Sequence, residues 1–435
     1  MNTQAFRNNI DKAHRSGAGI LPNGTLFDLD SFRTRRNNNV VILGASGAGK
    51  TRSYVIPNLL SAVGSYIIAD PKGNLYAQYA DYMRARGYQV RHIDLIHPFD
   101  SDKYNPMLYV HNSDDAAKLA NQIVSLGYKR VTSSADPFWE QAAAMLLTAM
   151  FALVTEDCPL VERSISSIAD IIARIRLNDD DDCPIENSEL DEIFWRHANR
   201  YSGTHFHQSW AYRQYLKFKS TPAKTLACIL ITLQTMLGTF DTGGLRSMTG
   251  SEETVDLQSI GAKKTVVFLE ISDTDRSKDL LANIFYSQAM NELCRYADDE
   301  CPNSRLPVGV RFILDDFGTN CRIHGFESMI SNIRSRNISA SLILQSEAQL
   351  RDGYGESAHT ILDNCDTLVY MGGNDIVTAK AISERCNQPL RKVLNMPIGT
   401  NWIFRRGEEP QYAESVDLSA YKQAEVKGVA GKSAH

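Results

Sequence analysis

The chain lacks the features that mark secreted, disulfide-bonded and membrane-spanning proteins. Its eight cysteines form no CxxC pair, so the sequence indicates neither a disulfide framework nor a zinc site. The longest nearly unbroken apolar run, AAAMLLTAMFALV at residues 142–154, is shorter than the roughly 18 residues that a membrane helix needs. The first residues, which include Asp11, Lys12 and Arg15, contain no apolar segment of the secretory type. These absences predict a protein of the reducing cytoplasm.

The net charge gives no simple indication of a binding partner. The chain has 46 basic and 51 acidic residues among 435, for a formal net charge of -5, so it has no global reason to bind nucleic acid or an anionic membrane. Any such binding has to come from local patches. With 43% hydrophobic and 22% charged residues, the composition is that of a globular protein with two or three domains.

Short β-like runs alternate with helical patterns in two blocks. The first block, at about residues 38–130, contains NVVIL at 39–43, SYIIA at 65–69 and YQVRHI at 88–93. The second begins near residue 262 and contains TVVFLEI at 265–271, VRFIL at 310–314, ISASLIL at 338–344 and TLVYM at 367–371. This alternation predicts an α/β fold with a mainly parallel central sheet.

Between the blocks, helix signals recur without a convincing strand. Ser188 with Asp191 fits a capping box, and Thr221 followed by Pro222 fits the start of a helix that Gly238 closes. We therefore predict an N-terminal segment at 1–36, an α/β domain formed by 37–131 and 251–415, an all-α insertion domain at 132–250, and a flexible tail at 416–435.

A phosphate-binding loop follows the first strand of the α/β domain. GASGAGKT at 44–51 fits the pattern GxxxxGK[ST] between a strand and a helix. We expect Lys50 to reach the β and γ phosphates of ATP and the Thr51 hydroxyl to bind Mg²⁺. The alternative is a glycine-rich turn that matches the pattern by chance. The predicted nucleotide-binding residues are Gly44, Ala45, Ser46, Gly47, Ala48, Gly49, Lys50 and Thr51.

A nucleoside triphosphatase also needs a carboxylate at the end of a neighbouring strand. The run FILDD at 312–316 supplies two: Asp315 as the metal-side carboxylate, and Asp316 directed at the water that attacks the γ phosphate. The alternative is a pair of solvated aspartates at a strand end. Pairing with the glycine loop favours the catalytic interpretation.

Three further side chains are candidates near this chemistry. Gln345, in LILQS, comes directly after the next strand and could sense the γ phosphate, or be an ordinary amide. Arg334 and Arg336 precede that strand, and either could act as an arginine finger for a neighbouring subunit. Solvated arginines at a helix end would look the same. Asp70-Pro71-Lys72-Gly73 closes another strand at the ligand-binding edge, where a turn would also favour these residues.

Several segments together resemble one protein family over about residues 35–405. They are NNNVVILGASGAGKTRSYVIPNLL at 37–60, DPKGNLY at 70–76, YNPM at 104–107, DPFWEQAAAMLLTA at 136–149, LDDF at 314–317, IRSRNIS at 333–339, LILQSEAQL at 342–350 and NCDTLVYMGGND at 364–375. In this order they resemble the TraG-like type IV coupling proteins, hexameric ATPases that bring DNA and relaxase to conjugative secretion channels.

The resemblance implies a RecA-like P-loop domain interrupted by an all-α domain that faces the cytoplasm and receives substrate. It carries over the roles of Lys50, Thr51, Asp315 and Gln345, and it places Arg334 at the family's finger position. It also implies a homo-hexamer that serves relaxase and DNA, the relaxosome, together with the ATPases and membrane components of a type IV secretion channel.

Three departures from the family pattern bear on these expectations. The family usually has Asp-Glu where this chain has Asp315-Asp316, and the shorter acid sets the base back by about 1.5 Å, which can slow chemistry about a hundredfold. Asn74 stands where the family has glutamate. Family members usually begin with membrane helices, whereas here only about 36 residues precede the strand that leads into the loop. We therefore expect either a cytoplasmic protein that a partner protein holds at the inner face of the membrane, or a soluble variant.

Local charge gives weaker indications. The acidic stretch from Asp179 to Glu192 fits a solvated loop or a docking surface for a basic partner. His205 and His207 have no acid or cysteine at metal spacing and are interpreted as structural. Basic groups that could contact DNA phosphates, or be ordinary surface charge, are Arg33, Arg35 and Arg36, then Arg84, Arg86 and Arg91, and then Lys217, Lys219 and Lys224.

The sequence thus predicts an ATPase that delivers relaxase-bound single-stranded DNA to a conjugative channel. Two alternatives stay open. One is a nucleotide-gated recruitment adaptor with weak hydrolysis, suggested by Asp316 in place of glutamate. The other is a DNA translocase like FtsK or HerA, unrelated to conjugation.

Overall fold

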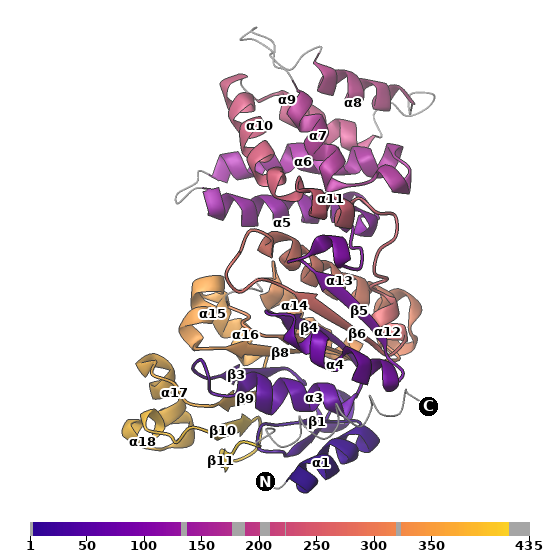
Figure 1. The fold of residues 1–435 in the computed structure, drawn as a ribbon. Helices are drawn as coiled ribbons and strands as arrows, with labels where there is room; N and C mark the ends of the chain where they lie inside the picture. The colour runs from indigo at the N-terminus through magenta and orange to yellow at the C-terminus, as the bar shows by residue number, and fades with distance from the viewer. Residues whose placement is uncertain are drawn as a thin grey trace. The chain divides into compact units, whose positions relative to one another are not determined.

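The computed structural model describes residues 3–131, 137–175, 188–200, 209–221, 223–318 and 323–416. Figure 1 shows the fold. The chain divides into two compact units. The first unit comprises Met1–Asp94, Asp256–Arg276 and Ala289–His435, and the second comprises Leu95–Val255 and Ser277–Gln288.

The first unit is an α/β unit that the chain enters three times. Before the second unit it forms α1 (Thr3–Ser16), β1 (Ala18–Ile20), β2 (Leu26–Asp28), α2 (Ser31–Thr34), β3 (Val40–Leu43), η1 (Thr51–Val55), α3 (Ile56–Ser61), β4 (Ser65–Asp70), α4 (Asn74–Ala85) and β5 (Gln89–Asp94). It then adds α12 (Ser259–Ala262) and β6 (Thr265–Glu270).

The last passage through this unit completes its sheet. It begins in the later part of α13 (Asp279–Glu300) and continues with η6 (Pro302–Ser304), β7 (Val310–Leu314), α14 (Phe326–Asn332), η7 (Ile333–Arg336), β8 (Ile338–Leu344), α15 (Glu347–Tyr354), α16 (Ser357–Asp363), β9 (Thr367–Tyr370), α17 (Ile376–Cys386), α18 (Leu390–Leu394), β10 (Thr400–Arg405) and β11 (Gln411–Glu414).

Nine strands form one sheet in the order β11-β10-β9-β3-β8-β7-β4-β6-β5. The pairings from β9 through β5 are all parallel. At one side of the sheet, β10 pairs antiparallel with both β9 and the edge strand β11. This arrangement confirms the predicted α/β class with a mainly parallel sheet. The order also places β3, β8 and β7 side by side, so the loops that follow these strands meet at one edge.

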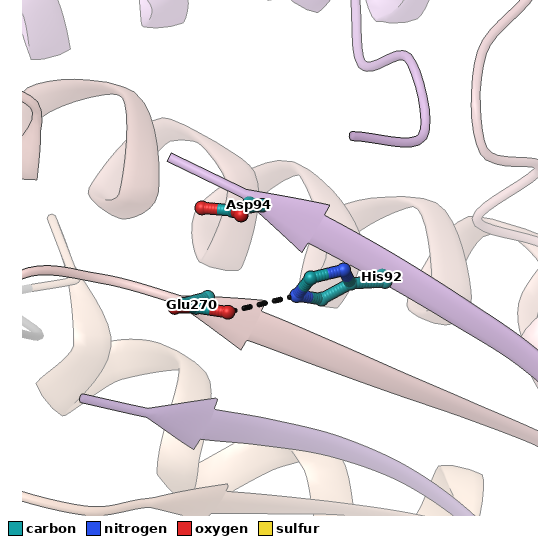
Figure 2. Close-up of side chains that lie close together, drawn as sticks. All are labelled: His92, Asp94 and Glu270. Atoms are coloured by element: carbon teal, nitrogen blue, oxygen red, sulfur yellow. Dashed lines mark hydrogen bonds and ion pairs between the residues drawn. The ribbon is translucent and has the colours of Figure 1, made fainter. Parts of the chain in front are cut away.

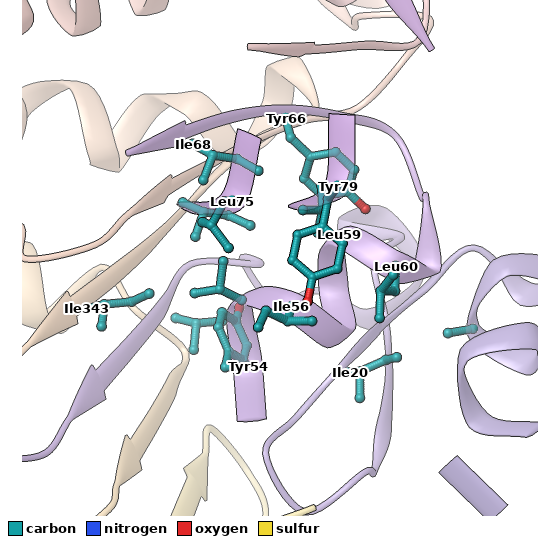
Figure 3. Packing of buried hydrophobic residues seen from close by; sticks show 14 of the residues in the cluster. Ile20, Tyr54, Ile56, Leu59, Leu60, Tyr66, Ile68, Leu75, Tyr79 and Ile343 are labelled. Carbon is teal, nitrogen blue, oxygen red and sulfur yellow. The ribbon is translucent and has the colours of Figure 1, made fainter. Parts of the chain in front are cut away.

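The central parallel strands are buried and largely apolar on both faces, as expected for strands covered on both sides. Every residue of β3, β4, β7, β8 and β9 is buried. Alternate residues of these strands, such as Val40, Ile68 and Ile343, enter one core with side chains of α1, α3 and α4. Figure 3 shows side chains of α3 and α4 meeting those of β4 in this core. All seven predicted strands are present, and in the five that are buried throughout, the β-branched runs have packing partners on both faces.

The sequence analysis missed four strands. β10 pairs with β9 through Trp402 and Tyr370, and β11 folds back onto β10. β1 and β2 form a separate two-stranded sheet. β1 and β2 have three residues each, and β11 is largely exposed, so these three give almost no periodic signal. The aromatic run in β10 carried the one usable indication.

The second unit is helical in the residues that are described. Its elements are η2 (Pro98–Asp100), η3 (Pro106–Tyr109), α5 (Ser113–Val131), α6 (Pro137–Asp157), η4 (Leu160–Glu162), α7 (Ile165–Arg174), α8 (Glu189–Arg200), α9 (Trp210–Lys219), α10 (Ala223–Leu237), η5 (Gly238–Phe240), α11 (Gly243–Thr249) and the start of α13. Ser188 accepts a hydrogen bond from the Asp191 N–H at 3.2 Å, which confirms its predicted position at a helix start.

The second unit begins at Leu95, upstream of residue 132, where the sequence places the start of the all-α domain. The reason is that α5 packs along α6 and joins its core. The predicted domain at 132–250 stays a prediction whose ends differ from those of the compact unit. The predicted tail lies almost wholly outside the described residues, which end at 416.

One helix among the described residues, over Phe138–Asp157, has the length and apolar composition to cross a membrane, and 67% of its apolar window is buried in the structure. The bent pair Thr225–Phe240 and Gly243–Thr249 passes the same test if its parts form one span. Core helices of globular proteins pass it as well. The burial of the first helix therefore favours a core position over contact with lipid.

We expect Ile343→Ala to lower the free energy of unfolding by about 2–5 kcal/mol, because it leaves a cavity in the core beneath α3. Ile343 is fully buried, whereas Ile398 is 95% exposed. Ile398→Ala is therefore the matched control and should change stability by less than about 0.5 kcal/mol. Urea unfolding of the three proteins measures the difference, and equal losses for both variants would contradict the packing described here.

Candidate nucleotide site

The loop at residues 44–51 is held between two strands of the sheet. The Gly44 N–H donates to the Leu344 carbonyl at 3.1 Å, and the Ala45 N–H donates to the Gly372 carbonyl at 2.9 Å. Gly47 and Gly49 have φ values of 80° and 88°, a left-handed backbone that favours glycine. Positive φ at these two positions shapes the tight, anion-binding turn that the sequence pattern predicts.

The helix after the loop begins with an irregular turn. Residues Thr51–Val55 form a π-helical turn, η1, in which the Ile56 N–H bonds to the Thr51 carbonyl. Pro57 follows in the first turn of α3 and has no N–H to give to a preceding carbonyl, which disfavours regular α-helix there. π-turns of this kind recur at functional sites.

Lys50 folds back over the loop. Its Nζ donates to the Gly44 carbonyl at 2.6 Å and to the Ala45 carbonyl at 3.1 Å. Burial lowers the pKa of Lys50, and the charges of Asp315 and Asp316 act in the opposite direction. The ammonium group therefore stands at the mouth of the loop, with carboxylates close enough to influence its protonation.

Thr51 and Asp315 join the two distant parts of the predicted site. The Thr51 hydroxyl donates to Asp315 Oδ2 at 2.8 Å across 264 positions of sequence. Asp315 is only 8% exposed. Burial raises the pKa of Asp315, while the Thr51 hydrogen bond and the Lys50 charge partly offset this rise. A buried carboxylate beside a hydroxyl is the hard oxygen donor set that Mg²⁺ prefers, so these residues fit that ion.

Asp316 adopts a left-handed backbone with φ of 54°. Its N–H donates to Asp315 Oδ1 at 3.1 Å, and the next N–H, of Phe317, donates to the Ile343 carbonyl at 3.1 Å. These bonds fix the turn that ends β7. Asp316 therefore projects from a defined backbone rather than from a loose loop.

A cavity of about 630 Å³ brings most of the predicted catalytic residues together. Lys50, Thr51, Asp315, Asp316 and Gln345 all line it, with Gln345 exposed. Its volume is within the usual range of about 300–1,000 Å³ for small-molecule sites. The same cavity is lined by residues that the sequence analysis did not assign, namely Arg52, Ile56, Leu75 and Gln78. The only sequence signal that could have assigned these four residues to the site is that they follow the glycine loop or the Asp70 turn.

The Asp70 turn forms another wall of this cavity, which Lys72 and Asn74 also line. Asp70 Oδ2 accepts hydrogen bonds from the Leu75 and Tyr76 N–H groups at 2.8 and 2.9 Å, so it caps α4. Burial raises the pKa of Asp70, with these backbone bonds opposing and the Glu270 charge adding to the rise. The two interpretations from the sequence are therefore compatible: the segment is a turn, and it also borders the cavity.

Beside this turn, His92, Asp94 and Glu270 lie at the ends of β5 and β6, as Figure 2 shows. Their ligand atoms lie within 4.8 Å of one another, and His92 Nε2 is 3.0 Å from Glu270 Oε2. The His92 ring stacks on Tyr76 at 3.7 Å between ring centroids. The three belong to the donor types that bind transition metals. The sequence analysis did not identify this group. His92 and Asp94 are close in the sequence, but Glu270 lies 176 positions after Asp94.

Arg334 does not line the nucleotide cavity of its own chain. Its Nη2 donates to the Ser31 carbonyl at 2.8 Å, and the residue lines a different cavity near the starts of β7 and β8. Arg336 donates hydrogen bonds to both oxygens of Asp298. The finger role of Arg334 toward a neighbouring subunit stays a prediction.

Several candidate DNA contacts are engaged within the chain. Arg33 pairs with Asp28, Arg36 with Glu408, Arg84 with Asp81 and Lys219 with Asp191. The pairs of Arg33 and Arg84 are exposed, and surface pairs of this kind are weak, whereas the pairs of Arg36 and Lys219 are largely covered. Residues 179–187 of the acidic stretch, with His205, His207 and Pro222, lie outside the described residues.

Comparisons with known proteins agree with this geometry. The model of a family described as "Type IV secretory system Conjugative DNA transfer" matches residues 4–390. No curated protein matches the chain.

Solved structures show the same fold at low identity. The unbound bacterial conjugative coupling protein TrwB has a TM-score of 0.64 at 14% identity, covering 95% of this chain and 91% of that one. TrwB in complex with ADP and Mg²⁺ has a TM-score of 0.64 at 14% identity, covering 94% and 91%. VirB4 of Thermoanaerobacter pseudethanolicus has a TM-score of 0.55 at 14% identity, covering 93% and 98%. The predicted RecA-like fold class is confirmed.

We expect Asp315→Asn to raise the melting temperature of the nucleotide-free protein at neutral pH. The native state of the wild type holds the Asp315 proton more tightly than the unfolded chain does, so wild-type stability falls as pH rises through the raised pKa. Asparagine carries no charge to bury, and its amide can donate to Thr51 Oγ1 while its oxygen accepts from the Asp316 N–H.

The gain should shrink toward about pH 3, where the carboxyl is protonated in both states. Thermal unfolding followed by circular dichroism across this range measures it. Asp352→Asn, at an exposed helix position, is the control and should change little at any pH. A destabilised Asp315→Asn at neutral pH would contradict the account of a charge buried at a cost.

Proposed function

The chain belongs to the type IV secretory system conjugative DNA transfer family, and from this premise we propose that it is a coupling ATPase that delivers relaxase-bound single-stranded DNA to a conjugative secretion channel. The observation that carries the proposal is the 2.8 Å hydrogen bond between Thr51 and Asp315. It joins the glycine loop to the acidic strand end, and a P-loop ATPase needs these two parts in one site.

The proposed nucleotide is ATP with Mg²⁺. TrwB has been solved with the ATP analogue ADPNP and with ADP and Mg²⁺, which supports this choice. In this chain the loop N–H groups and the start of the η1 turn would hold phosphate oxygens. Lys50 would exchange its bonds to the Gly44 and Ala45 carbonyls for bonds to the β and γ phosphates. Thr51 and Asp315 would hold the metal, which neutralises phosphate charge when bound.

The reaction proposed is attack of water on the γ phosphorus with cleavage of its bond to the bridging β–γ oxygen, giving ADP and inorganic phosphate. Asp316 would orient the water and accept its proton. Gln345, exposed in the same cavity, would contact the γ phosphate. Lys50 would stabilise the charge that builds on the leaving side.

The assembly proposed is a homo-hexamer in the cytoplasm, held at the inner face of the membrane by a partner. In such a ring Arg334 of one subunit would reach the γ phosphate of the next and stabilise its transition state. It would first have to leave the Ser31 carbonyl. The helical unit would receive relaxase and DNA, and channel ATPases and membrane components would be the further partners.

Asp316 motivates a second candidate function, a nucleotide-gated recruitment adaptor with weak hydrolysis. An aspartate reaches less far than the glutamate usual in the family, and a base that is misplaced by about 1 Å can cost about a hundredfold in rate. The family match favours either of these conjugative roles over a general DNA translocase.

We expect Lys50→Ala to reduce DNA-stimulated ATP turnover by at least about a hundredfold, because the γ phosphate loses its main cationic contact. Lys380→Ala, at an exposed position of α17, is the control and should retain full turnover. Phosphate release by the purified proteins with and without single-stranded DNA is the measurement. Unchanged turnover in Lys50→Ala would refute the ATPase assignment.

The variant Asp316→Glu separates the two candidate functions. An adaptor limited by the short acid should gain turnover by about tenfold or more, since the base moves toward its water. A competent motor should change less than about threefold. Steady-state ATP hydrolysis decides between them, with nucleotide binding measured in parallel to show that the site remains intact.

A further inference from the structure

A second cavity, of about 380 Å³, lies at the opposite edge of the sheet from the nucleotide site. Its lining includes Gly64 just before β4, Lys264 just before β6, Val310 at the start of β7 and Ile338 at the start of β8. Because these strands are parallel, their starts meet at one edge and their ends at the other. We name this the amino-edge cavity.

The lining of the amino-edge cavity is strongly basic. Its charged residues are one acid, Asp30, and four cations, Lys264, Arg305, Arg311 and Arg334. The Asp30 Oδ1 atom already accepts hydrogen bonds from the Phe32 and Arg33 N–H groups as the cap of α2. The cavity therefore gathers positive charge that its own carboxylate does not neutralise.

Arg311 is the deepest of these cations, with 3% of its surface exposed. Its Nη1 donates to Asn58 Oδ1 at 2.8 Å and its Nη2 donates to the Tyr54 hydroxyl at 3.2 Å. Its Nε is buried without a partner. No carboxylate in the described part of the chain forms an ion pair with it. A buried cation without a counter-charge is costly, so an anion brought into this cavity would gain a strong electrostatic attraction.

Arg305 adds a second incompletely satisfied guanidinium. Its Nη1 is buried without a partner, and its Nη2 donates to Asn337 Oδ1 at 3.3 Å. The nearest Asp30 oxygen is 4.0 Å from Nη2, at the limit for an ion pair. The group is stacked over the Phe32 ring at 4.7 Å, which holds its plane in place. Arg305 thus offers a pre-positioned donor.

We propose that the amino-edge cavity binds a small phosphate-bearing anion, either free polyphosphate or the phosphate end of a nucleotide. Guanidinium groups match phosphate oxygens with paired hydrogen bonds, and an excess of three positive charges suits a multiply charged anion. The cavity volume accommodates a group of this size. The site is separate from the P-loop and uses none of the residues proposed for hydrolysis except Arg334.

Pyrophosphate is the probe, and calorimetric titration of the full chain is the measurement. The Lys50→Ala protein is the background, because it lacks the main phosphate contact of the nucleotide cavity. We expect saturable pyrophosphate binding to persist in this background and to weaken at least about tenfold when Arg305→Gln or Lys264→Gln is added. Lys263→Gln is the matched control, because this exposed neighbour lies outside the cavity lining, and it should leave the affinity unchanged.

The outcomes separate the two sources of phosphate. Binding of ADP that is tighter than that of pyrophosphate in the same background, and that Arg305→Gln or Lys264→Gln weakens, supports a nucleotide. Equal or weaker ADP binding, or tighter ADP binding that neither cavity variant weakens, supports free polyphosphate. Loss of all binding in Lys50→Ala alone, or binding that is insensitive to both cavity variants, overturns the proposal. Binding of a single-stranded oligonucleotide but of neither small anion also overturns it. If Arg305→Gln does not fold, the exposed Lys264→Gln decides. No step depends on ATP turnover, so failure here leaves the ATPase proposal standing.

Discussion

The site depends on one interaction, the bond between a buried carboxylate, Asp315, and the Thr51 hydroxyl. It is possible only because β3, β8 and β7 are neighbours in the sheet, so residues 264 positions apart in the chain emerge at the same edge. Burial makes the charge of Asp315 expensive. For the same reason the ionised carboxylate would attract a divalent cation strongly, because little water solvates a carboxylate in a buried place.

The strand β7 connects two chemically opposite edges. Arg311 is near its start and borders the basic amino-edge cavity, while Asp315 directly follows its end and borders the nucleotide cavity. Between them lie Phe312, Ile313 and Leu314, all fully buried. A short, rigid strand packed on both faces therefore fixes the separation of the two charged groups.

The sequence predicted the parts of the fold that have strong local patterns. The runs at 310–314 and 338–344 coincide with β7 and β8, and the loop motif located the nucleotide cavity, because glycine, lysine and hydroxyl chemistry must occur at fixed spacing there. It missed the amino-edge cavity. That cavity takes single residues, such as Lys264, Arg305 and Arg334, from separate connections, and no spacing rule joins them before the sheet order is known.

The backbone at residue 316 gives a structural reason for the short acid found there. A left-handed conformation, with φ of 54°, is costly for most side chains, and aspartate tolerates it better than glutamate because its short polar group can bond locally. This turn is also needed for the hydrogen bond that the Asp316 N–H donates to the Asp315 carboxylate. Reach toward the water in the proposed reaction therefore favours glutamate at position 316, whereas the left-handed turn favours aspartate. This chain has the residue that favours the turn, which holds Asp315, the proposed metal-side carboxylate, in place and shortens the reach of the proposed base, Asp316.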